Sequence, residues 1–287
     1  MTEESRYVIF DNHMHLRQDG RLLSAVDMFL SAGGTTFNLV NLPDNSVGAA
    51  NHYEEIYGRT LRIASLLYSE KNMRVPVTLG PYPLDYFLFG EAGLNPMDEM
   101  KRGIDAACRL IEDGKAHAIG EIGRPHFPVS DRVNTECDEI ILYAMERAAD
   151  IGCPVILHTN DLAASGYRRL EELAGMAHLP LSRVVKHHAL AGDVVLETGV
   201  LMSILASRSN VKTAMNSRKP FLLETDYVDD ISLGWKVIPP DSVPRRARMI
   251  RSECPEWESV FELTFRELPM KLFGEENLVM KQRTSNG

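Results

Sequence analysis

Eight short apolar segments alternate with longer amphipathic segments along this 287-residue chain. The apolar segments have the composition of buried strands, and the segments between them repeat their apolar residues at helical spacing. We predict strands at Tyr7–His15, Thr36–Leu42, Val75–Leu79, Ala116–Ile122, Pro154–His158, Arg183–His188, Val200–Leu205 and Phe221–Asp226. We predict helices at Ser24–Ala32, Tyr53–Glu70, Asp98–Glu112, Glu136–Ala149, Tyr167–Ala174, near Gly192, at Val211–Ser217 and at Trp257–Phe273. This alternation predicts an α/β protein with a parallel sheet, and eight units in a chain of this size favour a single (β/α)8 TIM-barrel domain over residues 1–287.

The composition narrows the class of protein. Apolar residues make up 44% of the chain, which is enough for a large core, and no apolar run is long enough to span a membrane. The first residues lack the basic and apolar regions of a signal peptide, and the four cysteines are scattered. We therefore expect a cytoplasmic protein with reduced thiols and no membrane partner. A homo-oligomer is compatible with the sequence. The net charge of −9 excludes a generally basic nucleic-acid surface, although local basic clusters could still hold a phosphate.

Ligand-type residues end five of the predicted strands. They are His13 and His15, Glu121, His158, the pair His187 and His188, and Asp226. The carboxyl ends of the strands of a barrel meet at one rim, where active sites form. Because a polar side chain buried there without a partner is costly, a shared metal ion would satisfy the whole set. The sequence therefore predicts a metal site at the carboxyl-terminal rim.

The longest irregular segment lies between Asp229 and Arg245 and is rich in proline and glycine. A loop of this length in a compact domain is often a lid over a functional site. The other interpretation is a solvated excursion of the chain.

The strand-end pattern resembles the TatD-type metal-dependent hydrolases of the amidohydrolase superfamily. The matching motifs are His13-Met14-His15, Gly120-Glu121-Ile122-Gly123, Leu157-His158, a histidine on the sixth strand and Glu224-Thr225-Asp226, within a resemblance that runs from Phe10 to about Gly274. The chain is particularly similar to a less characterised TatD-related branch seen in archaea, through Gly123-Arg124-Pro125-His126, Asp226-Tyr227 and Val243-Pro244-Arg245-Arg246.

The resemblance implies a site for two divalent metal ions. His13, His15 and Asp226 would hold one ion, His158 and a histidine of the sixth strand the other, and Glu121 would bridge both. Neighbours on a strand point to opposite faces, so only one of His187 and His188 fits. The family places its histidine before a small residue, and His188 precedes Ala189, so we expect His188 to be the ligand and His187 to be packed elsewhere.

The expected chemistry is hydrolysis by a metal-activated water, with Asp226 as the general base and Glu121 holding the ions together. The imidazole-rich ligand set favours zinc, and the two carboxylates leave magnesium, manganese and nickel open. The family name implies phosphodiester hydrolysis on DNA, as in a deoxyribonuclease. Arg124 and His126 stand next to Glu121 and could orient a substrate anion, or they could belong to a rigid turn at Pro125.

Arg17 supports a second expectation. His13-Met14-His15-Leu16-Arg17 is similar to the signature of dihydroorotase-like cyclic amidases, in which the arginine clamps a substrate carboxylate. A cyclic amide or lactone hydrolase acting on a small carboxylated substrate is therefore the alternative, unless Arg17 only pairs with Asp19 or Glu224. A barrel that binds metal without catalysis is a third interpretation, although structural zinc sites are closed and mostly rich in cysteine.

Overall fold

The computed structural model describes residues 7–278, without the side chains of residues 234–236. Its centre is one sheet of parallel strands, and each strand from β1 to β7 pairs with the next strand along the chain. The strands are β1 (Phe10–His15), β2 (Thr36–Val40), β3 (Val77–Leu79), β4 (Ala118–Gly123), β5 (Val155–His158), β6 (Val184–Ala189), β7 (Leu201–Leu205), β8 (Leu222–Glu224) and β9 (Tyr227–Val228).

The two ends of the sheet are joined by one short stretch of chain. Strand β9 begins three residues after β8 ends and pairs with β1 rather than with β8. Between the two strands, the backbone N–H and the hydroxyl of Thr225 donate to the buried carboxylate of Asp11 in β1, at 3.0 and 2.7 Å. The curled sheet therefore has its last and first strands in contact.

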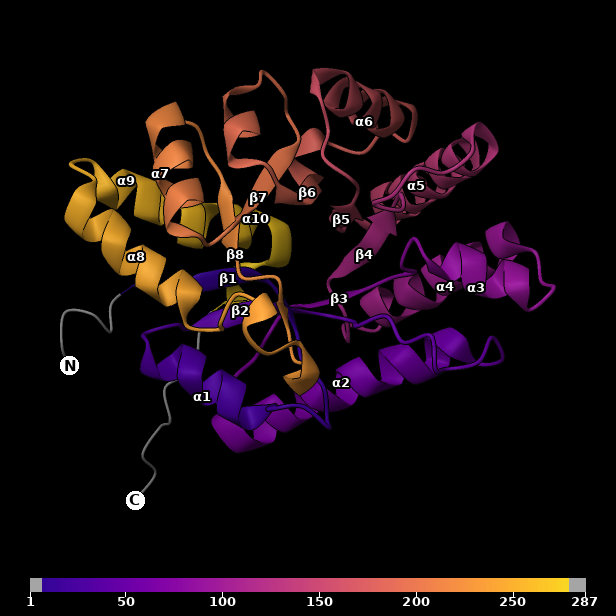
Figure 1. The fold of residues 1–287 in the computed structure, drawn as a ribbon, viewed down its shortest axis with the longest axis horizontal. Helices are drawn as coiled ribbons and strands as arrows, with labels where there is room; N and C mark the ends of the chain where they lie inside the picture. Colours follow the sequence, from indigo (N-terminus) through magenta and orange to yellow (C-terminus); the bar gives the residue numbers. More distant parts are fainter. Residues whose placement is uncertain (1–6, 279–287) are drawn as a thin grey trace.

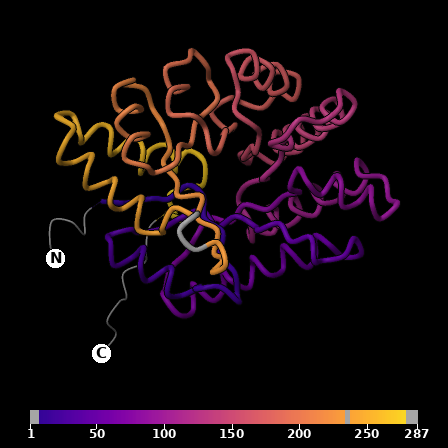
Figure 2. The backbone as a smooth tube through the Cα atoms, in the orientation of Figure 1, coloured from indigo at the N-terminus to yellow at the C-terminus, as the bar shows by residue number. Residues whose placement is uncertain are grey.

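Apart from α10, the helices cover the outside of the sheet and follow one another around the strands in chain order (Figures 1 and 2). The helices are α1 (Leu23–Ser31), α2 (His52–Lys71), α3 (Asp85–Glu91), α4 (Pro96–Glu112), α5 (Asp131–Ile151), α6 (Ala164–Met176), α7 (Arg208–Ser217), α8 (Ser242–Glu253), α9 (Trp257–Glu262) and α10 (Leu268–Phe273). Side-chain caps begin several of them: the side chain of Asn95 accepts a hydrogen bond at the start of α4, and Ser130 and Ser207 do so at α5 and α7.

Two apolar cores hold these layers together. The larger core lies between the sheet and the surrounding helices. The smaller core fills the inside of the sheet and is covered by α10, with the rings of Phe10 and Phe273 5.7 Å apart. Its strand residues are Phe10, Ala118, Ile156, Val185 and Leu222. Because most of these residues stand near the beginnings of their strands, the opposite, carboxyl-terminal ends are left for polar side chains.

The structure contains a strand at each of the eight predicted positions and a helical segment at each of the predicted helices, with shifted ends. The segment near Gly192 is a 3-10 helix, η3 (Ala191–Val195), and the last predicted helix is α9 and α10 joined by a π-helical segment, Leu263–Glu267. The sequence analysis missed α3, β9 and α8. The stretch between Asp229 and Arg245 is not wholly irregular, because it contains a 3-10 helix, η4 (Ile231–Lys236), and the first turn of α8.

None of the helices within residues 7–278 combines the length and the hydropathy that a membrane crossing requires.

Candidate metal centre

The carboxyl-terminal ends of four strands bring a compact set of ligand atoms together. His13 lies in β1, Glu121 in β4, His187 in β6, and Asp226 between β8 and β9. One ligand atom from each of these four residues lies within 4.8 Å of the others, and all but Asp226 are buried. The spacing suits a divalent metal ion held by imidazole nitrogens and carboxylate oxygens.

Glu121 lies at the middle of this set and faces four histidines. Its Oε1 atom forms a close contact with Nε2 of His13 and lies 3.3 Å from Nε2 of His15 and 3.8 Å from Nε2 of His187. Its Oε2 atom lies 3.2 Å from Nδ1 of His158. One carboxylate thus faces the histidines of β1 through Oε1 and His158 of β5 through Oε2, which is the position that a bridging ligand would need.

The ring nitrogens face one another as well as Glu121. Nε2 of His13 lies 3.2 Å from Nε2 of His15, and Nδ1 of His158 lies 2.9 Å from Nε2 of His187. A neutral imidazole carries one lone pair, and lone pairs that converge on one point are satisfied by a cation. The donor set therefore fits divalent metal.

Asp226 adds the least buried carboxylate. Its backbone is left-handed, with φ of 48°, at the break between β8 and β9. Oδ1 lies 3.7 Å from Nε2 of His15, and the side chain is 23% exposed. The cluster therefore reaches the surface at Asp226, unlike the closed shell of a structural zinc site.

The electrostatics also favour a bound cation. Burial alone would raise the pKa of Glu121 and of Asp226, but neighbouring histidines lower both below their ordinary values. Burial would lower the pKa of His13, yet the adjacent Glu121 raises it to about 9. Both carboxylates therefore stay ionised at neutral pH, and without metal the protonated imidazole of His13 offsets part of their charge.

The structure corrects the expected choice between His187 and His188. His187 is buried and its Nε2 faces Glu121, whereas the side chain of His188 is half exposed and its Nδ1 lies 3.2 Å from Oδ2 of Asp226. The reason lies in the alternation of side chains along β6. Val185 belongs to the smaller core, inside the sheet, and His187, two positions later, points to the same face. The geometry therefore places His187 among the candidate ligands and His188 beside them.

The sequence analysis predicted no role beside the cluster for two buried charged residues, Glu224 and Lys186. Glu224 in β8 accepts hydrogen bonds from the backbone N–H of His188 and from Oγ of Ser203, at 2.7 and 2.5 Å, and lies 3.4 Å from Nδ1 of His187. Lys186 is 1% exposed, and its Nζ donates to the carbonyl oxygens of Thr159 and His187. A charged residue inside an apolar strand was the available signal for both.

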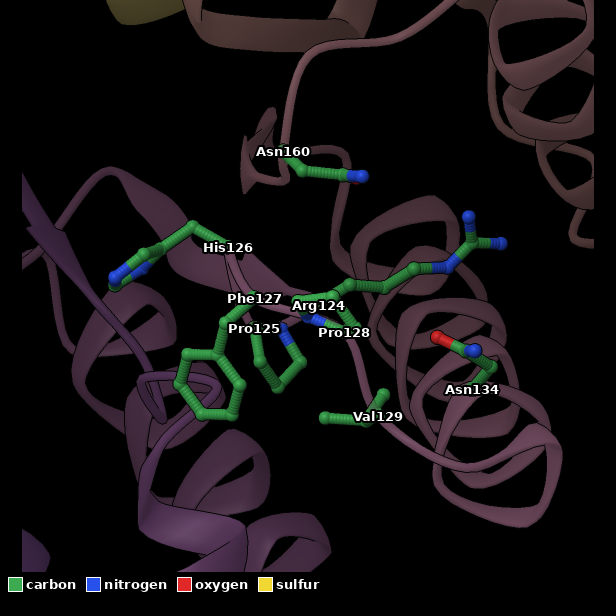
Figure 3. A pocket seen from close by; sticks show the side chains of 8 residues that line it. All are labelled: Arg124, Pro125, His126, Phe127, Pro128, Val129, Asn134 and Asn160. Atoms are coloured by element: carbon green, nitrogen blue, oxygen red, sulfur yellow. The ribbon is translucent and has the colours of Figure 1, made fainter.

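The three residues expected to bind substrate occupy different positions. The guanidinium of Arg17 pairs with both carboxylate oxygens of Asp19, at 2.9 and 2.7 Å. Arg124 forms an ion pair with Asp138 in α5, and in Figure 3 its guanidinium points away from the rings of His126 and Phe127. His126 is exposed, with its ring 6.0 Å from the ring of His158. Of these three residues, only His126 lies next to the cluster and has a side chain that is not paired with a carboxylate.

The loop after β4 borders a cavity of about 600 Å³. Residues 124–129 line this cavity together with Asn134 and Asn160 (Figure 3). On the other side of His158, the hydroxyl of Tyr82 lies 3.3 Å from Nε2 of that histidine. Tyr82 follows β3 and was not singled out from the sequence, because a tyrosine between two prolines has no ligand-type signature.

Comparison with known proteins gives consistent matches over most of the chain. A family model described as TatD related DNase matches residues 10–274. An uncharacterized protein of Methanocaldococcus jannaschii is 30% identical over 264 residues, which cover 89% of this chain and 92% of that protein. Among solved structures, a TatD homologue of Escherichia coli K12 superposes with a TM-score of 0.63 at 15% identity, over 94% of this chain and 98% of that one. An organophosphorus hydrolase of Deinococcus radiodurans superposes with a TM-score of 0.60 at 13% identity, over 94% of each chain.

Proposed function

This chain belongs to the family of TatD-related DNases, and we propose that it is a divalent-metal-dependent hydrolase that cleaves phosphodiester bonds, with DNA as a substrate. The observation that carries the proposal is the position of Glu121 in β4, whose two carboxylate oxygens face four histidines at the carboxyl ends of β1, β5 and β6. The contact of β9 with β1 supports a closed (β/α)8 barrel, in which this rim is the usual place for catalysis.

The ligand set is large enough for two ions. His13, His15 and Asp226 would hold one of them, and His158 and His187 would hold the other. Glu121 would bridge both. Four imidazoles and two carboxylates suit zinc first, and the same set also accepts manganese, nickel or magnesium. When bound, such ions activate water and neutralise charge on the phosphoryl oxygens.

The chain's own residues would handle the proton. Asp226 is ionised at neutral pH because neighbouring histidines lower its pKa against the effect of burial, so it can accept the proton of the attacking water. His188, whose Nδ1 lies 3.2 Å from Oδ2 of Asp226, is half exposed and can pass that proton to solvent. Burial together with Glu121 and Asp226 raises the pKa of Tyr82, so its phenol keeps its proton and can donate to a phosphoryl oxygen.

The alternative, a hydrolase of small carboxylated cyclic amides or lactones, has support from the similar fold of an organophosphate-hydrolysing protein that was engineered from a weak promiscuous lactonase. It needs a free cation to hold the carboxylate. Arg17 is paired with Asp19 and also lies 3.5 Å from Asp230, and Arg124 is paired with Asp138. These pairs favour the phosphodiester. The partial exposure of Asp226 argues against a metal-binding barrel without catalysis.

The test is a substrate screen on protein loaded separately with zinc, manganese, nickel and magnesium. We expect cleavage of bis(p-nitrophenyl) phosphate and of single-stranded DNA, and a loss of kcat/KM of about a hundredfold or more in Glu121→Ala. Glu172→Ala, which removes an exposed carboxylate on α6, is the matched control and should keep wild-type activity. Turnover of a lactone or carboxylated cyclic amide without diester cleavage would support the alternative, and no turnover by fully loaded protein would indicate a non-catalytic role.

A further inference from the structure

A row of aromatic rings leads outward from the candidate metal centre. The ring of His126 lies 6.0 Å from that of His158, Phe127 lies 5.6 Å from His126, and Phe87 lies 5.9 Å from Phe127. We call His126, Phe127 and Phe87 the aromatic wall. It connects the loop after β4 with α3, so it borders the rim beside the cluster.

Phe127 is the unusual member of the aromatic wall. The chain has ten phenylalanines, all within the described residues, and Phe127 is the one whose side chain is exposed, at 43%. Phe87 is partly buried against the larger core, but Phe127 does not belong to either core. A large ring that is left in water beside a reactive centre offers a flat apolar face to a ligand.

The surroundings of the aromatic wall are poor in free charge. Arg124, three residues before Phe127, is bound by Asp138, and Asp138 is shared with Arg169. In Figure 3 the guanidinium of Arg124 and the ring of Phe127 point in opposite directions. A second phosphate or a carboxylate would therefore find no unpaired arginine here. The nearby side-chain amides of Asn134 and Asn160 are exposed and uncharged.

We propose that the aromatic wall is a binding subsite for a planar heteroaromatic group, such as a nucleobase, that is attached to the phosphodiester at the metal centre. This inference rests on the proposed function and names its substrate class. Aromatic faces bind bases by stacking without requiring a charge, and stacking tolerates any base. The subsite would favour nucleotides over diesters of small aliphatic alcohols.

Two substrates that share a leaving group test the proposal. Thymidine 5′-(p-nitrophenyl phosphate) carries a base, methyl p-nitrophenyl phosphate does not, and both release p-nitrophenolate. We expect Phe127→Ala to raise the KM of the thymidine diester about tenfold, with its kcat and the kinetics of the methyl diester unchanged. The side chain lies outside both cores, so the variant should fold, and its circular dichroism checks this.

Three further variants make the result specific. Phe127→Tyr should restore the low KM because it keeps the ring, and Phe127→Leu should behave like Phe127→Ala because it keeps only apolar area. Leu94→Ala removes a similarly exposed apolar side chain after α3 and should change nothing. A leucine that restores the wild-type KM would overturn a subsite for planar groups.

The outcomes separate the subsite from the proposed function. If both diesters are cleaved with equal kcat/KM, and Phe127→Ala changes neither, the hydrolase stands and the subsite is wrong. If wild-type protein cleaves neither diester, the phosphodiesterase proposal is wrong, and binding of free thymidine then tests the subsite by equilibrium dialysis. Binding that is about tenfold weaker in Phe127→Ala supports it, and no binding to wild type overturns it.

Discussion

His187 and His188 are adjacent in sequence but face different surroundings. His187 is buried against Glu121, and His188 is half exposed against Asp226. The backbone of His188 is left-handed, with φ of 49°, so the regular alternation of β6 ends there. His187 thus has the environment of a metal ligand, and His188 has that of a residue that can pass protons to solvent.

We predict that His187→Ala loses bound metal and that His188→Ala keeps it. Removal of a buried imidazole from the cluster should weaken metal binding at least about tenfold, because the remaining ligands cannot complete the coordination shell. The measurement is metal content by mass spectrometry after dialysis against a weak chelator. Equal losses in the two variants would contradict the assignment of His187.

Glu224 is the residue most able to orient His187. Its carboxylate is fully buried, lies 3.4 Å from Nδ1 of His187 and accepts the backbone N–H of His188. A carboxylate on the far nitrogen of a histidine leaves the other nitrogen free for metal.

Glu224→Gln should therefore lower metal affinity about tenfold while the fold persists, since the amide oxygen can still accept the N–H of His188. Competition with a metal-binding dye measures the affinity. Glu253→Gln makes the same chemical change at an exposed ion pair with Arg208 and should have no effect. An unchanged affinity in Glu224→Gln would show that His187 does not depend on this carboxylate.

At the scale of elements, β4 and β5 lie against each other at Gly123 with no space for a side chain. A Cβ atom there would lie 1.6 Å from the carbonyl oxygen of His158, with which Gly123 is in register. No side chain fits between these strands without separating them, and both strands carry candidate ligands, Glu121 and His158.

Gly123→Ala should therefore lower the free energy of unfolding by about 3 kcal/mol and reduce metal content. Gly175→Ala in α6 is the control: a Cβ there meets nothing within 4 Å, and alanine should stabilise the helix by about 0.5 kcal/mol. Urea denaturation measures both changes. A Gly123→Ala variant as stable as wild type would mean that β4 and β5 separate more easily than their register suggests.

The predicted elements show which parts of the fold are determined by the local sequence. The strands and most helices follow from periodicity, because their apolar residues face the two cores. Helix α3 is only seven residues long, and its aromatic residues have no amphipathic pattern; it is held by tertiary packing through the fully buried Phe89. Helix α8 follows two prolines and carries four arginines, so its composition does not indicate a packed helix.

The same limit applies to the candidate centre. The strand-end rule identified His13, His15, Glu121, His158 and Asp226 as candidates because it needs only the order of strands. It could not predict that Arg124 would be bound by Asp138, since that pair depends on how α5 packs beside β4. It also could not predict the face of His187, because Val184 and Val185 are both apolar and only the structure shows that Val185 lies in the core inside the sheet.

At the scale of the molecule, the sheet is joined to itself by Asp229. Its buried carboxylate accepts the backbone N–H groups of Arg21 and Leu22, both at 2.8 Å, and its own N–H donates to the carbonyl of His15 at 3.1 Å. The hydroxyl of Tyr227 also donates to it, at 2.9 Å. One side chain thus ties the end of β9 to the segment that follows β1.

Asp229→Ala should lower the free energy of unfolding by about 3 kcal/mol, because several donors lose their acceptor. Asp230→Ala is the matched control: its carboxylate accepts only local bonds from Ser232 and lies 3.5 Å from Arg17, so we expect a loss below about 1 kcal/mol. The hydrogen bonds of Asp229 also lie between two candidate ligands, since His15 precedes them and Asp226 leads into β9. Their loss should therefore weaken metal binding in Asp229→Ala but not in Asp230→Ala. Added zinc should then stabilise Asp230→Ala by more than Asp229→Ala. Thermal unfolding with and without zinc measures this difference, and equal zinc-induced shifts would mean that the metal centre forms independently of the way the sheet is joined.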